Sequence, residues 1–473
     1  MTAASVLAGS RAARVLAPPR LRRRELGLLV VVGVTLLVGA ASLGTAAAGR
    51  LEVAGSTHLA AYLGSLVVLS LGLSLAGRRA DELILPAAGL LGGVGLLLML
   101  RLPQDLVGQE ILGLELGLAD LQLSWLLVAL GVVGILALVV RSDRWLRLYK
   151  YTWAAVGIGL LLLTFVLGEE TNGARLTLSL GPFSGQPSEL LKVILVVFFA
   201  GYLAENRALL AEARTRLVGP LSMPPPAALL PLLAMLGLAL SIVVVQRDLG
   251  AALLYYAVFL VMLYVATGSL FDVIGGIFLF GLGALGAAVV FPLVGLRIAA
   301  WLDPWTDPLG SGYQLIQALH AFARGGVFGT GLGAGLPEIG GSLPIPAVHT
   351  DFPLAALGEE IGLTGVMAVL GLYLVLVQRG LRIAAAARDD FGALLAIGLA
   401  AVIGVQAFII AAGNLKLIPL TGITLPFVSY GGSSLLANAL VVGLLLALSD
   451  PGDPVAPPPP RPRGRLSRLQ GRR

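Results

Sequence analysis

The sequence LFDVIGGIFLFGLGALGAAVVFP occupies residues 270–292, and WLDPWTDPLGSGYQ follows it at residues 301–314. The first stretch carries one charged residue, Asp272, and it exceeds the roughly 20 apolar residues that a helix needs to cross a bilayer. The second stretch is rich in Asp, Pro and Gly, which form turns. This boundary between a membrane span and a long polar connection sets the pattern for the chain.

Composition places the whole chain in a membrane. The 473 residues are 57% hydrophobic and only 12% charged, and the mean hydropathy is +0.94. Long apolar runs in such a chain indicate transmembrane helices. Cysteine is absent, which excludes disulfides and thiolate metal sites. His58, His320 and His349 are far apart, so no His-cluster spacing suggests a metal centre.

The apolar runs predict an all-α polytopic bundle with about twelve transmembrane helices. They lie near residues 27–49, 59–77, 84–101, 124–140, 152–168, 188–205, 227–245, 249–267, 270–292, 352–377, 392–412 and 427–449.

The positions of Lys and Arg predict the orientation. Most of the 32 basic residues fall in the N-terminal segment, in every second connection and in the C-terminal segment. Because cytoplasmic connections carry an excess of Lys and Arg, both termini are expected in the cytoplasm. The connection 293–351 is therefore expected on the extracytoplasmic side. The net charge of +6 is explained by membrane topology, and no nucleic-acid partner is expected.

Three regions follow from this organisation. Residues 1–25 form a basic cytoplasmic tail, 26–450 a polytopic membrane domain, and 451–473 a Pro- and Arg-rich cytoplasmic tail. Both tails are expected to be disordered and attracted to anionic membrane lipids. Docking of a partner is the alternative. The N-terminus is not expected to be a cleavable signal peptide.

A carboxylate and an amine lie inside the sixth predicted span. Glu189 and Lys192 are three residues apart in QPSELLK at residues 186–192, so they share one helix face. Helix capping with a local ion pair is one explanation. Charged groups in an apolar helix usually face a cavity, and we expect these two to line a substrate site. Arg175 in the preceding connection is a further candidate for binding substrate.

The long connection 293–351 carries three more candidates. Arg297 and Arg324 have the guanidinium groups that bind phosphate. Asp351 lies in HTDF, residues 349–352, where the tenth span begins. A helix N-cap is one explanation for Asp351. A general base is the sharper hypothesis, because the pKa of a carboxyl group beside a membrane is raised by desolvation.

The segment 413–434 is broken by Pro and Gly at the entry to the last span. Irregular backbone at this depth is tolerated only where it faces protein or water. Lys416 is a candidate for binding phosphate, and Ser429, Tyr430 and Ser433 for binding sugar hydroxyls. Asp248 in the turn QRDLG, residues 246–250, is either a helix N-cap or part of the substrate site.

These motifs together resemble the SEDS family (shape, elongation, division and sporulation), which includes FtsW-like and RodA-like proteins. The resemblance covers roughly residues 150–450 and rests on seven motifs in order: NGAR (172–175), QPSELLK (186–192), QRDLG (246–250), DPWTDPLGSGYQLIQA (303–318), HTDF (349–352), GEEIGLTG (358–365) and LPFVSYGGSS (425–434).

The resemblance implies a peptidoglycan glycosyltransferase that polymerises lipid II with a class B penicillin-binding protein. It implies that Asp351 matches the family's essential Asp, and that Glu189 and Lys192 match its cavity-lining acid and base. It also implies a core of ten spans, so the extra pair is expected at the N-terminus. Two departures stand out: Ala347 replaces a frequent Glu, and Arg247 replaces the usual Pro of QPDLG.

The expected chemistry is a single displacement in which Asp351 takes the proton of the acceptor hydroxyl. A divalent cation could assist the reaction, although the sequence contains no recognisable cluster of metal ligands. Two alternatives remain: a flippase for lipid-linked precursors, and an inactive scaffold for a wall-synthesis partner. A flippase needs charged residues along a path through both membrane halves, whereas the notable residues here gather on the extracytoplasmic side.

Overall fold

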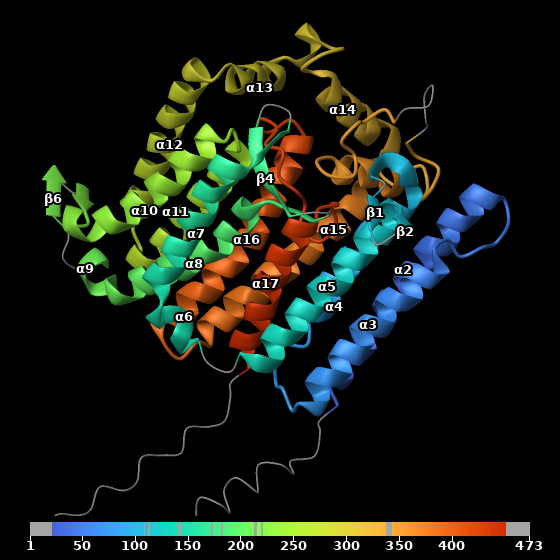
Figure 1. The fold of residues 1–473 in the computed structure, drawn as a ribbon, viewed down its shortest axis with the longest axis horizontal. Helices are drawn as coiled ribbons and strands as arrows, with labels where there is room; N and C mark the ends of the chain where they lie inside the picture. The colour runs from blue at the N-terminus through green and yellow to red at the C-terminus, as the bar shows by residue number, and fades with distance from the viewer. Residues whose placement is uncertain are drawn as a thin grey trace, which may run out of the picture.

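The computed structural model (Figure 1) describes residues 21–450 apart from 108, 112–113, 141–142, 172–173, 181–182, 212–214, 219–220 and 337–342. Residues 1–20 of the expected N-terminal tail and the whole C-terminal tail lie outside the described residues.

Helices dominate the described chain. They are α2 (Arg23–Ala48), α3 (Ser56–Leu75), α4 (Ile84–Arg101), α5 (Leu118–Val139), α6 (Arg144–Leu148), α7 (Lys150–Leu167), α8 (Pro187–Glu205), α9 (Arg207–Ala211), α10 (Pro226–Val245), α11 (Leu249–Thr267), α12 (Leu270–Val290), α13 (Pro292–Leu302), α14 (Tyr313–Gly325), α15 (Pro353–Ala385), α16 (Asp390–Asn414) and α17 (Gly432–Ser449). Two 3₁₀ turns, η2 (Gln104–Val107) and η3 (Pro304–Thr306), lie between them.

Three small antiparallel sheets occupy the connections. They consist of β1 (Gln109–Ile111) with β2 (Leu114–Leu116), β3 (Glu169–Thr171) with β4 (Ala174–Leu180) and β5 (Phe183–Gly185), and β6 (Thr215–Val218) with β7 (Leu221–Met223).

Twelve of the described helices are long and apolar enough to cross a membrane, which confirms the predicted class and number. Some boundaries differ from those predicted. The tenth span continues to Ala385, and the last begins at Gly432 instead of near residue 427. The last span starts late because Phe427 has a left-handed φ of 66° that a helix does not accommodate.

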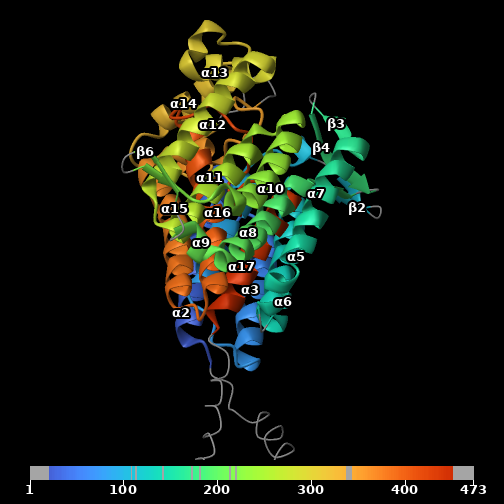
Figure 2. The same cartoon turned by 90° about the vertical axis from the view of Figure 1, so that its left-hand side faces the viewer.

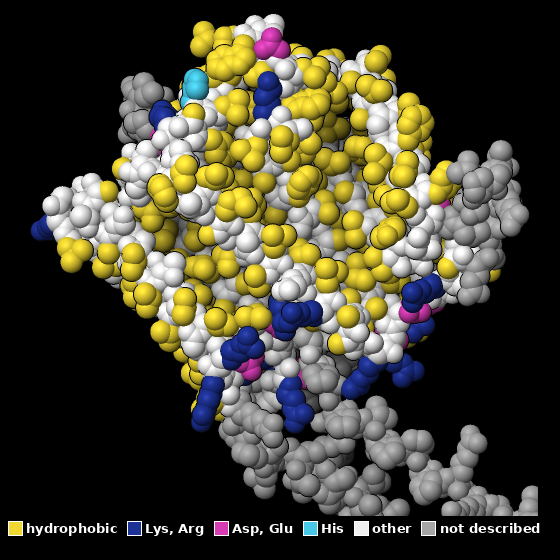
Figure 3. Space-filling model, turned by 180° about the vertical axis from the view of Figure 1, so that it is seen from behind, with side chains coloured by type: hydrophobic (Ala, Val, Ile, Leu, Met, Phe, Trp, Pro, Cys, Tyr) yellow, Lys and Arg dark blue, Asp and Glu magenta, His cyan; other side chains and the backbone are white. Residues whose placement is uncertain are grey.

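The interior helices carry the polar site. In an apolar 18-residue stretch of each helix, 78% of the residues are buried in α4 and in α8, and 72% are buried in α16. In α12 none of these residues is buried. Figure 2 shows α8, α16 and α17 in the middle of the bundle, with α13 and α14 at one end. From behind, apolar side chains cover the middle of the molecule and Lys and Arg gather at its lower end (Figure 3).

The predicted loop 293–351 is partly helical. It contains α13, η3 and α14, so Arg297 lies on a helix and not on a loop. Figure 1 shows α13 passing over the end of the bundle from α12 towards α14. The apolar run of Pro292–Leu302 explains why the chain stays helical beyond the ninth span.

The glycine-rich segment after α14 packs against a break in α15. Gly362 has φ 65° and ψ −172° inside that helix. The N–H groups of Leu363 and Thr364 donate to the carbonyls of Gly326 and Val327 at 3.0 and 3.1 Å. A Cβ on Gly329 would lie 2.2 Å from the Glu360 carbonyl oxygen. The close approach of the two backbones therefore accounts for the glycine at residue 329, and a bound phosphate is not needed to explain it.

Candidate active site

Asp351 lies in a tight turn immediately before α15. Its N–H donates to the Ala347 carbonyl at 2.9 Å, and its own carbonyl accepts from the Asn414 side chain at 3.0 Å. Burial raises the pKa of the Asp351 carboxyl group, while a hydrogen bond from Thr350 and the charge of Arg297 partly oppose that rise. Ala347 stands where the resemblance predicts a Glu, and its backbone carbonyl accepts the hydrogen bond that closes this turn.

Arg297 and Asp351 meet at Gly422. A Cβ on Gly422 would lie 3.9 Å from the Arg297 Nη2 atom and 3.9 Å from the Asp351 Oδ2 atom. Arg297 also donates to the Thr421 carbonyl at 3.4 Å. Gly422 has a φ of +70°, a backbone conformation that is unfavourable for residues with a side chain. The connection between α16 and α17 thus lies against both the carboxylate and the guanidinium.

The predicted acid–base pair of α8 lines a cavity that also reaches Gly422. Lys192 Nζ lies 2.6 Å from Glu189 Oε2 and donates to Gln406 Oε1 at 2.9 Å. Only 2% of the Lys192 side chain is exposed. The cavity has a volume of about 30 Å³ and is lined by Gln186, Ser188, Glu189, Lys192, Asp248, Ala251, Leu254, Tyr255, Gly422, Ile423 and Thr424.

Asp248 combines both of the roles considered from sequence. As the N-cap of α11 it accepts from the Ala251 N–H at 3.0 Å. It also accepts from the Ser188 hydroxyl and the Gln186 amide, each at 3.2 Å. Burial raises the pKa of Asp248, and the nearby Arg297 charge lowers it. Arg297 therefore acts electrostatically on both carboxyl groups.

The serines of the last motif hold the site together. The Ser429 hydroxyl accepts from the Leu425 N–H at 2.8 Å and donates to the Thr350 carbonyl at 2.6 Å. Ser433 accepts from the Gln186 N–H at 2.9 Å. These contacts use the hydroxyls that sequence alone suggested for sugar binding. The Tyr430 side chain, which lies beside His349 with ring centroids 6.1 Å apart, has no hydrogen-bond partner within the described residues.

The remaining predicted cations lie in different surroundings. Arg324 forms an ion pair with buried Glu359, with 3.1 Å between Nε and Oε1. Lys416 follows α16 with a left-handed φ of 59°, and its carbonyl accepts from Trp301 at 3.1 Å. The Arg175 backbone pairs with Glu170 between β4 and β3, but its side chain lies outside the described part of the chain.

Four residues of the site were missed from sequence. Gln406 and Asn438 accept hydrogen bonds from Lys192, at 2.9 and 3.5 Å. Asn414 donates to the Asp351 carbonyl, and Gly422 lies beside both Asp351 and Arg297. Single amides inside apolar spans were the available signal for three of them. The described residues contain no group of three or more His, Asp or Glu side chains arranged to hold a metal ion.

Comparison with known proteins identifies the family of this chain. A family model described as "Cell cycle protein", covering FtsW, RodA and SpoVE, matches residues 83–451. The chain belongs to the FtsW/RodA/SpoVE family. That match begins at α4, so the extra helix pair α2 and α3 precedes the family core, as predicted.

Similar proteins include two named peptidoglycan glycosyltransferase RodA. The one from Mycobacterium bovis is 43% identical over 372 residues, which is 78% of each chain. The one from Mycobacterium leprae is 41% identical over 438 residues, or 91% of each chain. A probable peptidoglycan glycosyltransferase FtsW from a Geobacter species is 40% identical over 293 residues, which is 61% of the present chain and 76% of the Geobacter protein.

Two solved structures share the fold of this family member. A chain from a peptidoglycan synthase complex that coordinates polymerization and crosslinking superposes with a TM-score of 0.59 at 28% identity, covering 78% of this chain and 98% of that one. Thermus thermophilus RodA gives a TM-score of 0.53 at 25% identity, covering 78% and 97%.

Proposed function

We propose that this protein is a peptidoglycan glycosyltransferase that polymerises lipid II into glycan strands for cell elongation or division. Relatives that match most of this chain are named for peptidoglycan glycosyltransferase activity. The observation that carries the proposal for the site is the convergence on Gly422, which lies against Asp351 and Arg297 and also lines the cavity of Glu189 and Lys192.

Asp351 acts as the general base in this proposal. It removes the proton from the 4-hydroxyl of the acceptor GlcNAc as that oxygen bonds to the anomeric carbon of the donor MurNAc. The bond from that carbon to the pyrophosphate oxygen breaks, and undecaprenyl pyrophosphate leaves with the electron pair. One base and a stabilised leaving group are sufficient for displacement with inversion. A raised pKa favours Asp351 for this task, because a stronger base accepts the proton more readily.

Arg297 is the first choice for binding the pyrophosphate. Its guanidinium lies beside the same glycine as the Asp351 carboxylate, and its hydrogen bond to the Thr421 carbonyl is a long one of 3.4 Å. Arg324 is a weaker choice, because Glu359 already holds its guanidinium through two contacts. Lys416 stays a candidate, since it adjoins the same connection between α16 and α17.

Orientation and partner complete the proposal. The basic residues of the N-terminal segment and of alternate connections favour both termini in the cytoplasm. Asp351 then acts at the extracytoplasmic face of the bacterial cell membrane. A class B penicillin-binding protein is the proposed partner, and the similar chain from a synthase that couples polymerization to crosslinking supports it.

Polymerisation of purified lipid II tests this function. The full chain, with and without its cognate class B partner, is compared with Asp351→Asn and with Asp307→Asn. Asp307 is an exposed carboxyl group of the same connection, residues 293–351, and accepts a hydrogen bond from the Ser311 N–H. We expect glycan strands from wild type and Asp307→Asn but not from Asp351→Asn. Equal polymer from all three would refute Asp351 as the base, and none from wild type with its partner would favour lipid transport or scaffolding.

A further inference from the structure

A basic hollow lies where the start of α2 meets the ends of α15 and α17. It has a volume of about 670 Å³. Its charged lining residues are Arg23, Arg24, Arg79, Asp81, Glu82, Arg379 and Arg382, and its apolar lining residues include Leu21, Leu83, Ile383, Ala386 and Leu448. Three separate segments contribute the arginines, so the cluster is a product of the fold and not of one basic run.

The acids of the hollow already have partners. The Asp81 carboxylate pairs with Arg379, and Glu82 accepts from the Glu25 N–H at 3.2 Å. By contrast, the side chains of Arg23, Arg24, Arg79 and Arg382 have no hydrogen-bond or ion-pair partner within the described residues, and all four are exposed. Five arginines against two carboxylates leave the hollow with an excess of three positive charges.

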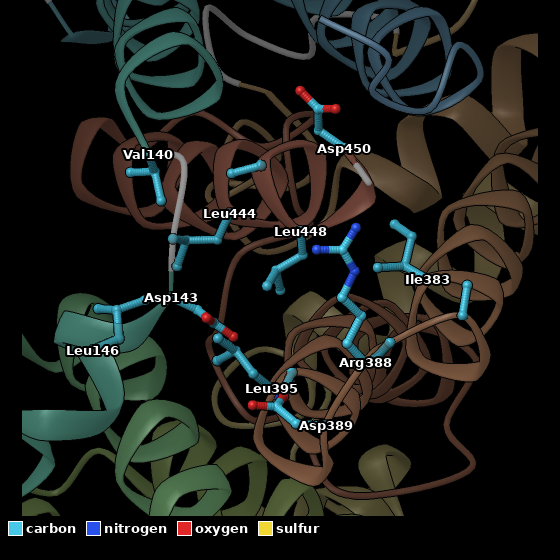
Figure 4. A pocket seen from close by; sticks show the side chains of 14 residues that line it. Val140, Asp143, Leu146, Ile383, Arg388, Asp389, Leu395, Leu444, Leu448 and Asp450 are labelled. Atoms are coloured by element: carbon cyan, nitrogen blue, oxygen red, sulfur yellow. The ribbon is translucent and has the colours of Figure 1, made fainter. Parts of the chain in front are cut away.

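A neighbouring hollow shows that this charge is local. It has a volume of about 300 Å³ and shares Ile383, Ala386 and Leu448 with the basic hollow. Its own lining includes three carboxylates, Asp143, Asp389 and Asp450, with Arg388 reaching towards the shared wall (Figure 4). Anions are therefore expected on one side of that wall and not on the other.

The arginines stand at helix ends beside apolar side chains. Arg23 and Arg24 begin α2, and Arg382 lies in the last turn of α15. The ends of spanning helices lie at the level of the lipid headgroups. Leu21 is 57% exposed at the same place, so a molecule that offers both a phosphate and hydrocarbon matches the lining. We propose that this hollow binds the headgroup phosphate of an anionic phospholipid.

The bound lipid would join two parts of the molecule. Arg23, Arg24 and Arg79 lie before residue 83, where the family match begins, whereas Arg382 lies within it. A phosphate held by both sets therefore ties the N-terminal helix pair to the family core. This role is independent of the reaction at Asp351, at the other end of the bundle.

Lipid binding by the purified full chain tests the proposal. Three probes are titrated in neutral detergent: phosphatidylglycerol, phosphatidylcholine and inorganic phosphate. Native mass spectrometry counts bound lipid, and thermal unfolding reports stabilisation. The variant Arg24→Gln/Arg79→Gln/Arg382→Gln removes one unpaired charge from each segment. Its control, Arg461→Gln/Arg463→Gln/Arg465→Gln, removes the same charge from the C-terminal segment.

We expect wild type and the control to retain phosphatidylglycerol and gain thermal stability, and the hollow variant to bind it on the order of 100-fold more weakly. Phosphatidylcholine and inorganic phosphate are expected to give no stabilisation. If the control variant bound phosphatidylglycerol equally weakly, the lipid would be held by diffuse electrostatic attraction and not by this hollow. An equal effect of inorganic phosphate would make it a site for free anions, and unchanged binding by the hollow variant would overturn the proposal.

Discussion

The guanidinium of Arg297 and the carboxyl group of Asp351 both lie against Gly422, although they are far apart in sequence. The charge of Arg297 opposes the rise in the pKa of Asp351 that burial causes. The same arginine is the first choice for binding the leaving pyrophosphate. In the proposed reaction, one side chain therefore acts on both the base and the leaving group.

Replacing Arg297 is expected to move the pH profile in a defined direction. The active form of Asp351 is the carboxylate, so activity rises as pH passes upwards through its pKa. Arg297→Gln removes a positive charge that lowers this pKa, and the acid limb of kcat/KM should move to higher pH. Arg324→Gln is the control, because Glu359 holds that guanidinium. An unmoved limb in Arg297→Gln would contradict the electrostatic link.

Gly422→Ala is expected to impair catalysis. The left-handed φ of +70° would cost an alanine about 1–2 kcal/mol. Relief of that strain shifts the backbone that lies against Arg297 and Asp351, and misplacement near 1 Å lowers kcat by up to about 100-fold. Gly413→Ala is the matched control, because its Cβ would meet its nearest neighbour at an ordinary 3.7 Å without a positive φ. Steady-state kinetics of both variants checks this, and equal activities would argue against a positioning role for Gly422.

Lys192→Met is expected to destabilise the fold. Lys192 is 2% exposed and lies 2.6 Å from Glu189, so its removal leaves a carboxylate without its cation in the bundle interior. Breaking such a pair costs about 3–5 kcal/mol. The double variant Lys192→Met/Glu189→Gln removes both charges and should recover much of the loss. Thermal unfolding in detergent compares the two, and a single variant as stable as wild type would show that the pair is not needed for folding.

Arg247→Pro tests the departure from the QPDLG pattern. Arg247 has a φ of 65°, and its N–H donates to the Val244 carbonyl at 3.0 Å. Proline fixes φ near −65° and lacks that N–H, so the variant should lose more than about 1 kcal/mol relative to Arg247→Ala. Thermal unfolding of the two variants measures the difference. Equal stability would mean that the turn adopts another backbone shape.

Hydrophobic length was enough to predict the membrane fold, because each span must satisfy its backbone internally and remain apolar for about 20 residues. It was not enough to place the ends of α15 and α17. The break at Gly362 and the bend at Phe427 depend on contacts with distant segments, which no local pattern contains.

Sequence alone drew attention to residues where a charge interrupts an apolar run, and their role in binding substrate stays a prediction. Glu189 and Lys192 were recognised in this way, and the structure places both at one cavity. Ser429 and Ser433 show the limit of the method. Sequence does not distinguish a hydroxyl that binds substrate from one that stabilises a loop. In the structure, the Ser429 hydroxyl bonds to a backbone carbonyl of the turn before α15, and the Ser433 hydroxyl bonds to the Gln186 N–H. The catalytic role of Asp351 stays a prediction.

The contact between the glycine-rich segment and α15 has a consequence for how Asp351 is carried. The Thr330 hydroxyl donates to the Glu359 carbonyl, 29 residues along the chain, and the Thr330 N–H donates to the same oxygen. The chain between them is thereby closed into a ring, and Asp351 sits on that ring close to its closure. Because the entropic cost of closing a loop grows only slowly with its length, a few residues more or fewer between Thr330 and Asp351 would change the cost of closing this ring little.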